Sequence, residues 1–217
     1  MKNLRGVICK VLIGAIVLTS ITACDDEAIS KNDADVGYIN ALGDQANFYS
    51  KKASESSHLF DSGNRTVTLL QGASSEQLRH KWFGYEYTFF GVENANNRDN
   101  QVSMDRLLKD SHDYWAVAWL NGSKAKLSMI ESVSSDQNDI YRVRIFANKE
   151  LDVYVDDSLT KSLTTKVGEV SPFLDIRTCT GLVVGQNNID LCQVDFGDSY
   201  LAVVNEVGLV SLVKEKG

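Results

Sequence analysis

Ser158 and Lys161 have the Ser-x-x-Lys spacing in which a lysine takes the proton of a serine and makes its oxygen a nucleophile. That chemistry belongs at the start of a helix, whereas this segment lies between two stretches that we expect to be strands. The chain also contains no Gly-rich phosphate loop, Gly-x-Ser-x-Gly turn, His-Glu-x-x-His helix or Cys-x-x-Cys pair. We therefore interpret the spacing as a coincidence and expect no enzymatic activity and no catalytic residues.

Possible metal ligands are present, but their spacing does not form a site. Asn94, Asn96, Asp99 and Asn100 offer oxygen atoms to calcium, but the Gly and the terminal Glu of a calcium loop are missing. The three histidines are scattered along the chain without ligand-like spacing. We expect a solvated polar loop here, with no metal and no cofactor.

Cys24 follows a segment that is typical of export. A basic start leads into an uncharged apolar run from Val11 to Ile21, and then into the small residues Thr22 and Ala23. The run of about 11 residues is shorter than the roughly 20 needed to cross a bilayer. Its end resembles the lipobox of bacterial lipoprotein signal peptides, which consists of an aliphatic residue, two small residues and a cysteine.

The resemblance implies that the chain is cut just before Cys24 and that the Cys24 thiol is diacylated. Two or three acyl chains anchor a protein stably, since each buried CH2 contributes about 0.8 kcal/mol and one chain is marginal. Asp25 resembles the signal that retains lipoproteins of enteric-type Gram-negative bacteria in the inner membrane. We therefore expect a lipid anchor on the periplasmic face, with the inner membrane favoured over the outer.

The mature chain is acidic and of moderate length. The signal holds three of the 22 basic residues, which leaves 19 against 29 acidic residues and a formal charge of −10. Phosphate contacts need clustered Lys and Arg, so we expect no nucleic-acid partner and no adsorption to anionic lipid beyond the anchor itself. The 194 residues from Cys24 onward suit one large all-β domain or two small ones.

Cys179 and Cys192 are the two cysteines outside the signal and the lipidation site. Export brings such a pair into an oxidising compartment, where a disulfide normally forms. Metal binding is the alternative, but it requires further ligands. A hairpin of Thr178–Val184 and Asn188–Val194 would bring the two cysteines to the distance that a disulfide needs.

Beyond the signal, apolar and polar residues alternate with the period of two that is typical of strands. Along Trp82–Phe90 this alternation places four aromatic residues on one face. Further expected strands are Val36–Leu42, Asn47–Lys51, Thr66–Leu70, Tyr114–Leu120, Lys124–Ile130, Tyr141–Ile145, Leu151–Asp156, Gly181–Val184, Tyr200–Asn205 and Leu209–Lys214. One short helix is expected near Met104–Lys109. The fold class is all-β.

Two parts of the chain resemble each other. Tyr114-Trp115-Ala116-Val117 is echoed by Tyr200-Leu201-Ala202-Val203, and each is followed by one more alternating strand. We expect two tandem β-sandwiches, with one larger β-sandwich as the alternative. The expected boundaries are 1–23 for the signal peptide, 24–34 for an acidic tether, 35–132 for the first sandwich with an inserted loop 93–111, and 139–217 for the second sandwich.

The second copy opens with Arg-Val-Arg-Ile-Phe-Ala at Arg142–Ala147 and continues with Asp-Val-Tyr-Val-Asp-Asp at Asp152–Asp157. This resembles an exported immunoglobulin-like family, a domain of unknown function, with the patterns R-V-x-V-N-A and D-V-Y-V-D-G. The first copy matches more weakly through Gly37–Ala41 and Asn47–Tyr49. The family's Ser-Pro turn is missing, and Asp157 replaces a Gly. The resemblance implies tandem immunoglobulin-like sandwiches and carries no functional residues.

Trp82 and Trp115 lie on strand faces opposite to those of their apolar neighbours, so either one, if exposed, would form a binding patch. Alternating aromatic residues usually form the core between sheets, and Tyr114 and Tyr200 resemble structural tyrosine corners. We expect a lipid-anchored envelope protein with a non-enzymatic interaction or assembly role and a protein or glycan partner. A carbohydrate-binding module that uses exposed aromatic residues is the alternative.

Overall fold

The all-β prediction is confirmed. The computed structural model describes residues 31–98, 100–156 and 160–216, and these contain sixteen strands in four sheets of four. One 3-10 turn, η1 (Ser62–Asn64), is the only helical element among the described residues. No helix in the described part of the chain is long and apolar enough to cross a membrane.

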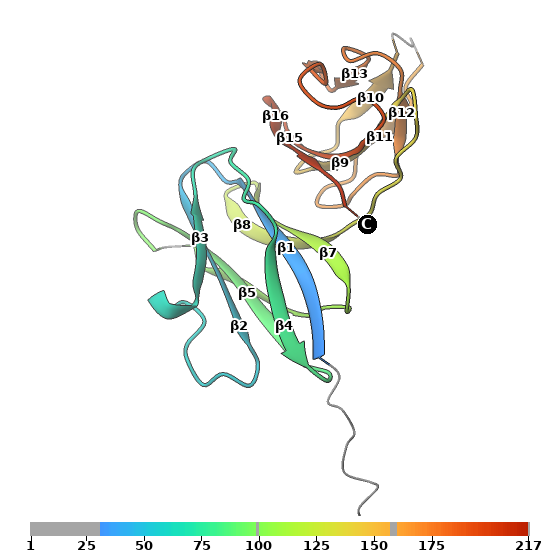
Figure 1. The fold of residues 1–217 in the computed structure, drawn as a ribbon. Coiled ribbons are helices and arrows are strands. Elements are labelled where there is room, and N and C mark those ends of the chain that lie inside the picture. Colours follow the sequence, from blue (N-terminus) through green and yellow to red (C-terminus); the bar gives the residue numbers. More distant parts are fainter. Residues whose placement is uncertain (1–30, 99, 157–159, 217) are drawn as a thin grey trace, which may run out of the picture. The chain divides into compact units, whose positions relative to one another are not determined.

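The first sandwich consists of two of these sheets (Figure 1). The first sheet contains, in spatial order, β4 (Leu78–Phe83), β1 (Lys31–Ala41), β7 (His112–Asn121) and β8 (Lys124–Ser132). The facing sheet contains β3 (Arg65–Leu69), β2 (Ala46–Lys52), β5 (Tyr87–Asn94) and β6 (Val102–Leu107).

The second sandwich is built in the same way. Its first sheet contains β12 (Leu174–Ile176), β9 (Tyr141–Ala147), β15 (Ser199–Asn205) and β16 (Gly208–Lys214). The facing sheet contains β11 (Leu163–Thr164), β10 (Asp152–Val155), β13 (Leu182–Val184) and β14 (Asn187–Ile189).

The two sandwiches have the same topology. Adding eight to each strand number converts the orders 4-1-7-8 and 3-2-5-6 into 12-9-15-16 and 11-10-13-14. The first strand of each sandwich pairs in parallel with the seventh, β1 with β7 and β9 with β15. Two similar sandwiches in tandem, as expected, therefore make up the described part of the chain.

Alternation along the strands fills a separate core inside each sandwich. The first core contains Tyr38, Phe48, Phe90 and Tyr114, none of them exposed to solvent. The second is formed by the following buried residues, among others: Val143, Ile145, Val153, Leu182, Ile189 and Ala202. Burial of such side chains contributes about 1.5–3 kcal/mol each, so both sandwiches contain a substantial core.

A third apolar cluster lies between the sandwiches, where the outer face of β1 and β7 meets the outer face of β9, β15 and β16. The first sandwich contributes Ile39, Trp115, Val117, Trp119 and Ile130, and the second contributes Phe146, Leu201, Val203 and Val213. Because both faces of these two sheets are covered, their central strands are apolar throughout instead of alternating. Asn32–Gly217 accordingly forms one compact unit.

The two tyrosines that resemble tyrosine corners occupy equivalent positions. The Tyr114 hydroxyl accepts a hydrogen bond from the backbone N–H of Lys109 at 3.1 Å, and the Tyr200 hydroxyl donates one to the carbonyl of Asp195 at 2.9 Å. Each partner lies five residues before its tyrosine. Both side chains are buried, so their role is structural.

The predicted helix near Met104–Lys109 is wrong, because residues 104–107 belong to strand β6 and the next two are irregular. Val102 and Met104 pack against the first core, whereas Ser103 and Asp105 are exposed, which is a period of two. Pairing with β5 overrides the weak helix propensity of this segment. The expected inserted loop 93–111 therefore contains a strand, with β14 as its counterpart in the second sandwich.

The described part of the expected tether is already a strand, since β1 begins at Lys31 instead of after residue 34. Ala34 is buried and lies opposite His112 on β7, and Ser111 donates its backbone N–H to the carbonyl of Asp33. Pairing with the next strand along the sheet thus orders polar residues that show no apolar periodicity.

Candidate functional site

The sequence-predicted site residues have different outcomes. Cys24 and Asp25, the expected lipidation site and sorting signal, lie outside the described residues. Trp82 and Trp115 are buried, with exposed fractions of 3 % and 5 %, so the expected binding patch is wrong. Trp82 points from β4 into the core of the first sandwich.

Trp115 lies on the outer face of its sheet, as its parity predicts, but the second sandwich covers that face. Its six-membered ring lies over the backbone of Gly37 on β1, where an added Cβ would be only 2.2 Å from a ring atom. The pattern of one strand shows which face a side chain occupies. It does not show that a second sandwich packs onto that face.

The exposed aromatic residues of the first sandwich lie where β4 turns into β5. Phe83, Tyr85 and Tyr87 are exposed by 57 %, 98 % and 50 %, and Leu107 on β6 lies opposite Tyr87. We call Phe83, Tyr85 and Tyr87 the aromatic turn. Within the expected strand Trp82–Phe90, these side chains occupy the outer face instead of the core.

The aromatic turn is connected to two other segments of the first sandwich. Asn32 at the start of β1 donates its Nδ2–H to the carbonyl of Gly84 at 2.9 Å. The backbone N–H of Ser54 donates to Glu86 Oε1 at 3.0 Å. Hydrogen bonding to the Ser54 side chain, and then to its backbone, lowers the pKa of Glu86. The acidic side chain of the turn therefore bonds back to the protein, whereas the aromatic rings extend into solvent.

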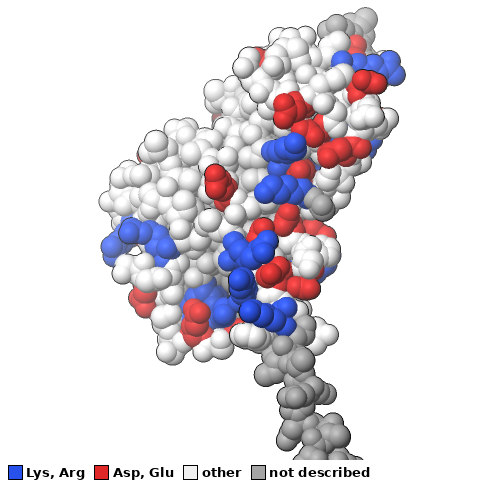
Figure 2. All heavy atoms as spheres, in the orientation of Figure 1, with Lys and Arg blue, Asp and Glu red and all other residues white. Residues whose placement is uncertain are grey.

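A basic cleft of about 340 Å³ lies beside the aromatic turn, lined by Lys51, Lys52, Arg79, His80 and Lys81, among others. Figure 2 shows Lys and Arg side chains gathered on this part of the first sandwich, with Asp and Glu among them. Burial lowers the pKa of His80 to about 4, so its imidazole is neutral at neutral pH.

Two of the cations in the basic cleft are held by the protein itself. Arg79 pairs with Asp35 at 2.9 Å, and Lys51 Nζ donates to the carbonyl of Ser57 at 2.6 Å. Within the described part of the chain, Lys52 and Lys81 form no ion pair. These two ammonium groups are therefore available for an anion next to the aromatic turn.

A second hollow, of about 320 Å³, lies where the two sandwiches meet; we call it the junction groove. One wall is Gln71–Gly72 of the first sandwich, and the other is the β15–β16 hairpin with Val207 and Leu209. Val207 is 80 % exposed at the tip of this hairpin. The groove is therefore apolar on one side and requires both sandwiches.

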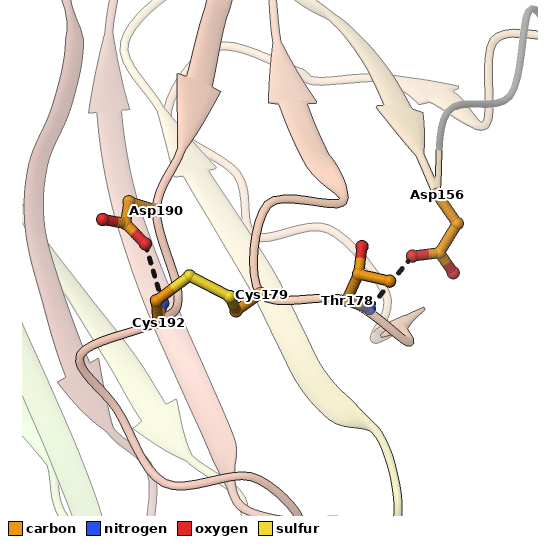
Figure 3. Close-up of a disulfide and its surroundings, with 5 residues drawn as sticks. All are labelled: Asp156, Thr178, Cys179, Asp190 and Cys192. Atoms are coloured by element: carbon orange, nitrogen blue, oxygen red, sulfur yellow. Dashed lines mark hydrogen bonds between the residues drawn. A yellow bond between two sulfur atoms is a disulfide. The ribbon is translucent and has the colours of Figure 1, made fainter.

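The predicted disulfide between Cys179 and Cys192 is present in the structure, with the two Cα atoms 4.7 Å apart (Figure 3). The hairpin between the cysteines is shorter than expected, since only β13 and β14 pair. Cys192 donates its backbone N–H to Asp190 Oδ1, and Thr178 donates its own to Asp156. Asp156 also accepts the backbone N–H of Arg177. Closing a loop of this size contributes about 3 kcal/mol, so the bond stabilises the small second core.

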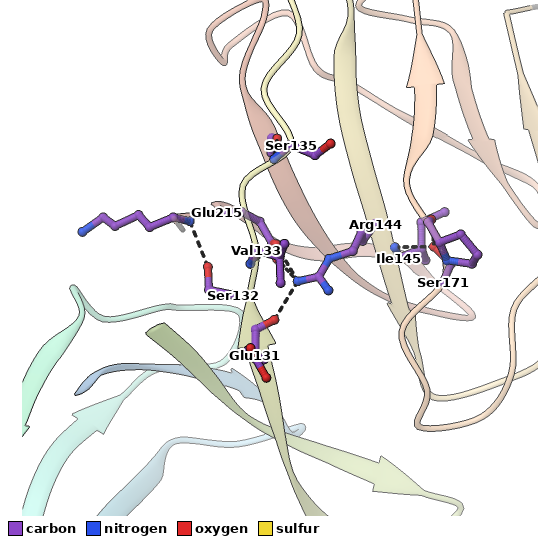
Figure 4. Close-up of polar contacts among 11 residues, drawn as sticks. Glu131, Ser132, Val133, Ser135, Arg144, Ile145, Ser171 and Glu215 are labelled. Carbon is purple, nitrogen blue, oxygen red and sulfur yellow. Dashed lines mark hydrogen bonds and ion pairs between the residues drawn. The ribbon is translucent and has the colours of Figure 1, made fainter. Parts of the chain in front are cut away.

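A buried ion pair lies at the junction of the sandwiches (Figure 4). Arg144 on β9 donates to Glu215 Oε1 at 2.7 Å and to the carbonyl of Glu131 at 2.8 Å. Glu215 Oε2 also accepts the backbone N–H of Val133 at 2.9 Å, and the carboxylate is fully buried. Burial raises the pKa of Glu215, although Arg144 acts in the opposite direction. This pair thus connects the end of β8 to the second sandwich.

A second buried carboxylate, Glu93, lies on the outer face of β5. It accepts hydrogen bonds from the Tyr49 hydroxyl at 2.5 Å and from Gln101 at 2.8 Å. Burial acts to raise the pKa of Glu93, but these hydrogen bonds bring it below its usual value. Both carboxylate oxygens are engaged, so the group serves the structure of this sheet.

The possible calcium ligands and the Ser-x-x-Lys pair remain without a site. Asn94 bonds to Asp44 and to the backbone of Asn96, while Asp99 and Ser158 are not among the described residues. Lys161 pairs with Asp152 at 3.2 Å. Among the described residues, no group of three or more His, Cys, Asp or Glu side chains is placed to hold a metal ion.

No family model and no curated protein matches this chain. The candidate surfaces are therefore those that the geometry itself supplies, namely the aromatic turn with its basic cleft, and the junction groove. The alternation pattern contained a signal for the turn, because Gly84 and Glu86 interrupt the apolar run between Trp82 and Thr88.

Proposed function

We propose that this chain is a lipid-anchored cell-envelope protein with a non-enzymatic interaction or assembly role. The lipobox that ends at Cys24 supports the anchor, and Asp25 supports retention at the inner membrane, on its periplasmic face. The formal charge of −10 in the mature chain argues against nucleic acid as the partner. The partner is a protein or a glycan of the envelope.

The junction groove is the observation that carries the interaction role. Val207, at the apolar tip of the hairpin, is 80 % exposed. A partner that covers this tip lowers the free energy of the system by about 25 cal/mol for each Å² of apolar surface removed from water. The groove has one wall from each sandwich, so its shape depends on how the two sandwiches pack. The pair of sandwiches would then serve to present this groove to a protein partner.

Replacing Cys24 by Ala is expected to abolish lipidation and to block processing by the lipoprotein pathway, so that the chain keeps its signal segment. The reason is that the diacylglycerol attaches to the Cys24 sulfur, which alanine lacks. Incorporation of labelled fatty acid, together with fractionation of inner and outer membranes, measures both the anchor and its place. Fatty acid on the Cys24→Ala protein, or wild-type protein in the outer membrane alone, would contradict the anchor or the sorting role of Asp25, respectively.

Replacing Val207 by Asp is expected to reduce crosslinking of the anchored protein to its envelope partner at least several-fold. The carboxylate would have to be desolvated in the groove, and that costs more than the lost apolar contact. Crosslinking in intact cells, followed by mass spectrometry, measures the effect. Val167→Asp, at another partly exposed valine of the second sandwich, is the matched control and should leave the crosslink intact. Equal loss in both variants would count against the groove.

Glycan binding is the second candidate function, and the aromatic turn is the observation that favours it. Exposed Tyr and Phe rings stack on sugar rings, and Lys52 and Lys81 beside them would suit an acidic sugar. The turn would then contact a cell-wall or surface polysaccharide while the lipid holds the protein at the membrane.

A further inference from the structure

The aromatic turn lies at the end of the molecule where the described chain begins. Asn32, the second residue of β1, donates a hydrogen bond to the carbonyl of Gly84 inside the turn at 2.9 Å. The junction groove lies at the other end of the same strand, because Gly72 in its wall donates its N–H to the carbonyl of Asn40. From Asn32 to Asn40 the strand spans about 26 Å, so the two candidate surfaces are far apart.

The length of chain between Cys24 and β1 limits how far the turn can be from the bilayer. Seven peptide units join the Cα atoms of Cys24 and Lys31, and they reach at most about 25 Å when fully extended. A lipid on Cys24 therefore keeps the start of β1, and the turn bonded to it, within reach of the membrane surface.

We propose that the rings of the aromatic turn, Phe83, Tyr85 and Tyr87, insert into the interfacial region of the phospholipid bilayer that holds the lipid on Cys24. This inference rests on the proposed lipid anchor. The protein would then contact the membrane at two points, the acyl chains and the turn. The second contact would hold β1 in a preferred orientation and direct the junction groove away from the membrane.

The chemistry of the turn suits this layer of the bilayer. Tyr and Phe bury their rings at the level of the headgroups, where a Tyr hydroxyl remains hydrated. Lys52 and Lys81 in the neighbouring basic cleft are placed to meet lipid phosphates. Glu86 lies between Tyr85 and Tyr87, and its carboxylate accepts the backbone N–H of Ser54, so the protein itself binds this negative charge. Because the whole chain is acidic, the contact relies on the rings and not on net charge.

A nitroxide label tests the contact in the mature lipidated protein, which begins at Cys24. The mature chain with an acylated Cys24 and the Cys179–Cys192 disulfide has no other cysteine, so Tyr85→Cys introduces a single labelling site. In phosphatidylcholine vesicles, we expect the label at position 85 to collide several-fold more with oxygen, relative to a water-soluble nickel chelate, than the same label at Val207→Cys. Val207 is the matched control because it is also a highly exposed tip, at the far end of the molecule.

A second pair of substitutions separates insertion from mere closeness to the tether. Adding Phe83→Ser and Tyr87→Ser to Tyr85→Cys removes the rings but leaves the anchor, and should return the label at position 85 to water. The same two serines added to Val207→Cys should leave the label at position 207 unchanged. Unchanged depth in that variant would overturn insertion by the rings. The mass of the acylated N-terminal peptide, measured in the same sample, reports the anchor separately.

Three other outcomes distinguish membrane contact, glycan binding and loss of the lipid anchor. Lipidated protein whose label at position 85 is as exposed to water as the label at 207 would overturn the membrane contact and leave the anchor standing. If that label is instead immobilised by added peptidoglycan fragments, glycan binding replaces membrane contact as the role of the turn. Unacylated protein would refute the anchor and, with it, the inference built on it.

Discussion

Replacing Trp119 by Ala is expected to lower the free energy of unfolding of the whole protein by about 3–5 kcal/mol. The indole lies between the sandwiches, where its ring meets Phe146 edge-on at 5.6 Å between ring centres. It also fills the space over Gly168, where an added Cβ would be 2.7 Å from the ring, and its Nε1–H donates to Ser128. Truncation leaves a cavity that neither sheet can close without moving.

Urea denaturation followed by circular dichroism measures this loss, with the wild type expected to unfold in a single transition because its two sandwiches form one compact unit. Tyr85→Ala is the control, since it removes an aromatic ring that is 98 % exposed and should change the free energy by less than about 0.5 kcal/mol. Equal stability of the Trp119→Ala protein and the wild type would mean that the sandwiches do not pack through this cluster.

Replacing Glu215 by Ala is the second change with a large expected effect, a loss of about 3–5 kcal/mol. Its carboxylate is fully buried, and Arg144 beside it is almost so. Without Glu215, the guanidinium of Arg144 remains in the junction with the backbone carbonyl of Glu131 as its hydrogen-bond acceptor among the described residues. The N–H of Val133 also loses its partner. An uncompensated buried charge costs more than the pair itself contributes.

Glu206→Ala is the matched control, because Glu206 also forms an ion pair, with Lys149, but both side chains are mostly exposed. Its loss should cost no more than about 1 kcal/mol. The double variant Arg144→Met with Glu215→Leu should recover most of the stability, because it removes both buried charges. The raised pKa of Glu215 agrees with this expectation, since it indicates that burial disfavours the charged carboxylate. Thermal unfolding at fixed pH compares the variants, and an unaltered Glu215→Ala midpoint would contradict the role of the pair.

The period-two pattern predicted most strands because alternation is a local property of the chain. Strands β1, β2, β3, β7, β8, β9, β10, β13, β15 and β16 each overlap one of the expected segments, and β4 and β5 both overlap the single expected strand Trp82–Phe90. The segment Val102–Leu107 was missed because its local propensity is helical, and only pairing with β5 makes it a strand.

The same pattern could not assign faces at the aromatic turn or at Trp115. Phe83, Tyr85 and Tyr87 share a parity, but β4 and β5 belong to different sheets, so no single strand carries them into a core. Trp115 faces away from its own sandwich and is nevertheless buried, because a segment more than 80 residues later in the chain covers it.

The sequence by itself determined that the chain is all-β, that two similar units follow one another, and that Cys179 and Cys192 form a pair. The strand pattern and the repeat are local properties of the chain, and the disulfide was predicted because Cys179 and Cys192 are the two cysteines that follow Cys24. Only the tertiary structure decided which aromatic residues meet water and which carboxylates are buried. Those properties depend on the packing of one sandwich against the other, since a side chain's exposure is set by the chain segments that cover it and not by its own strand.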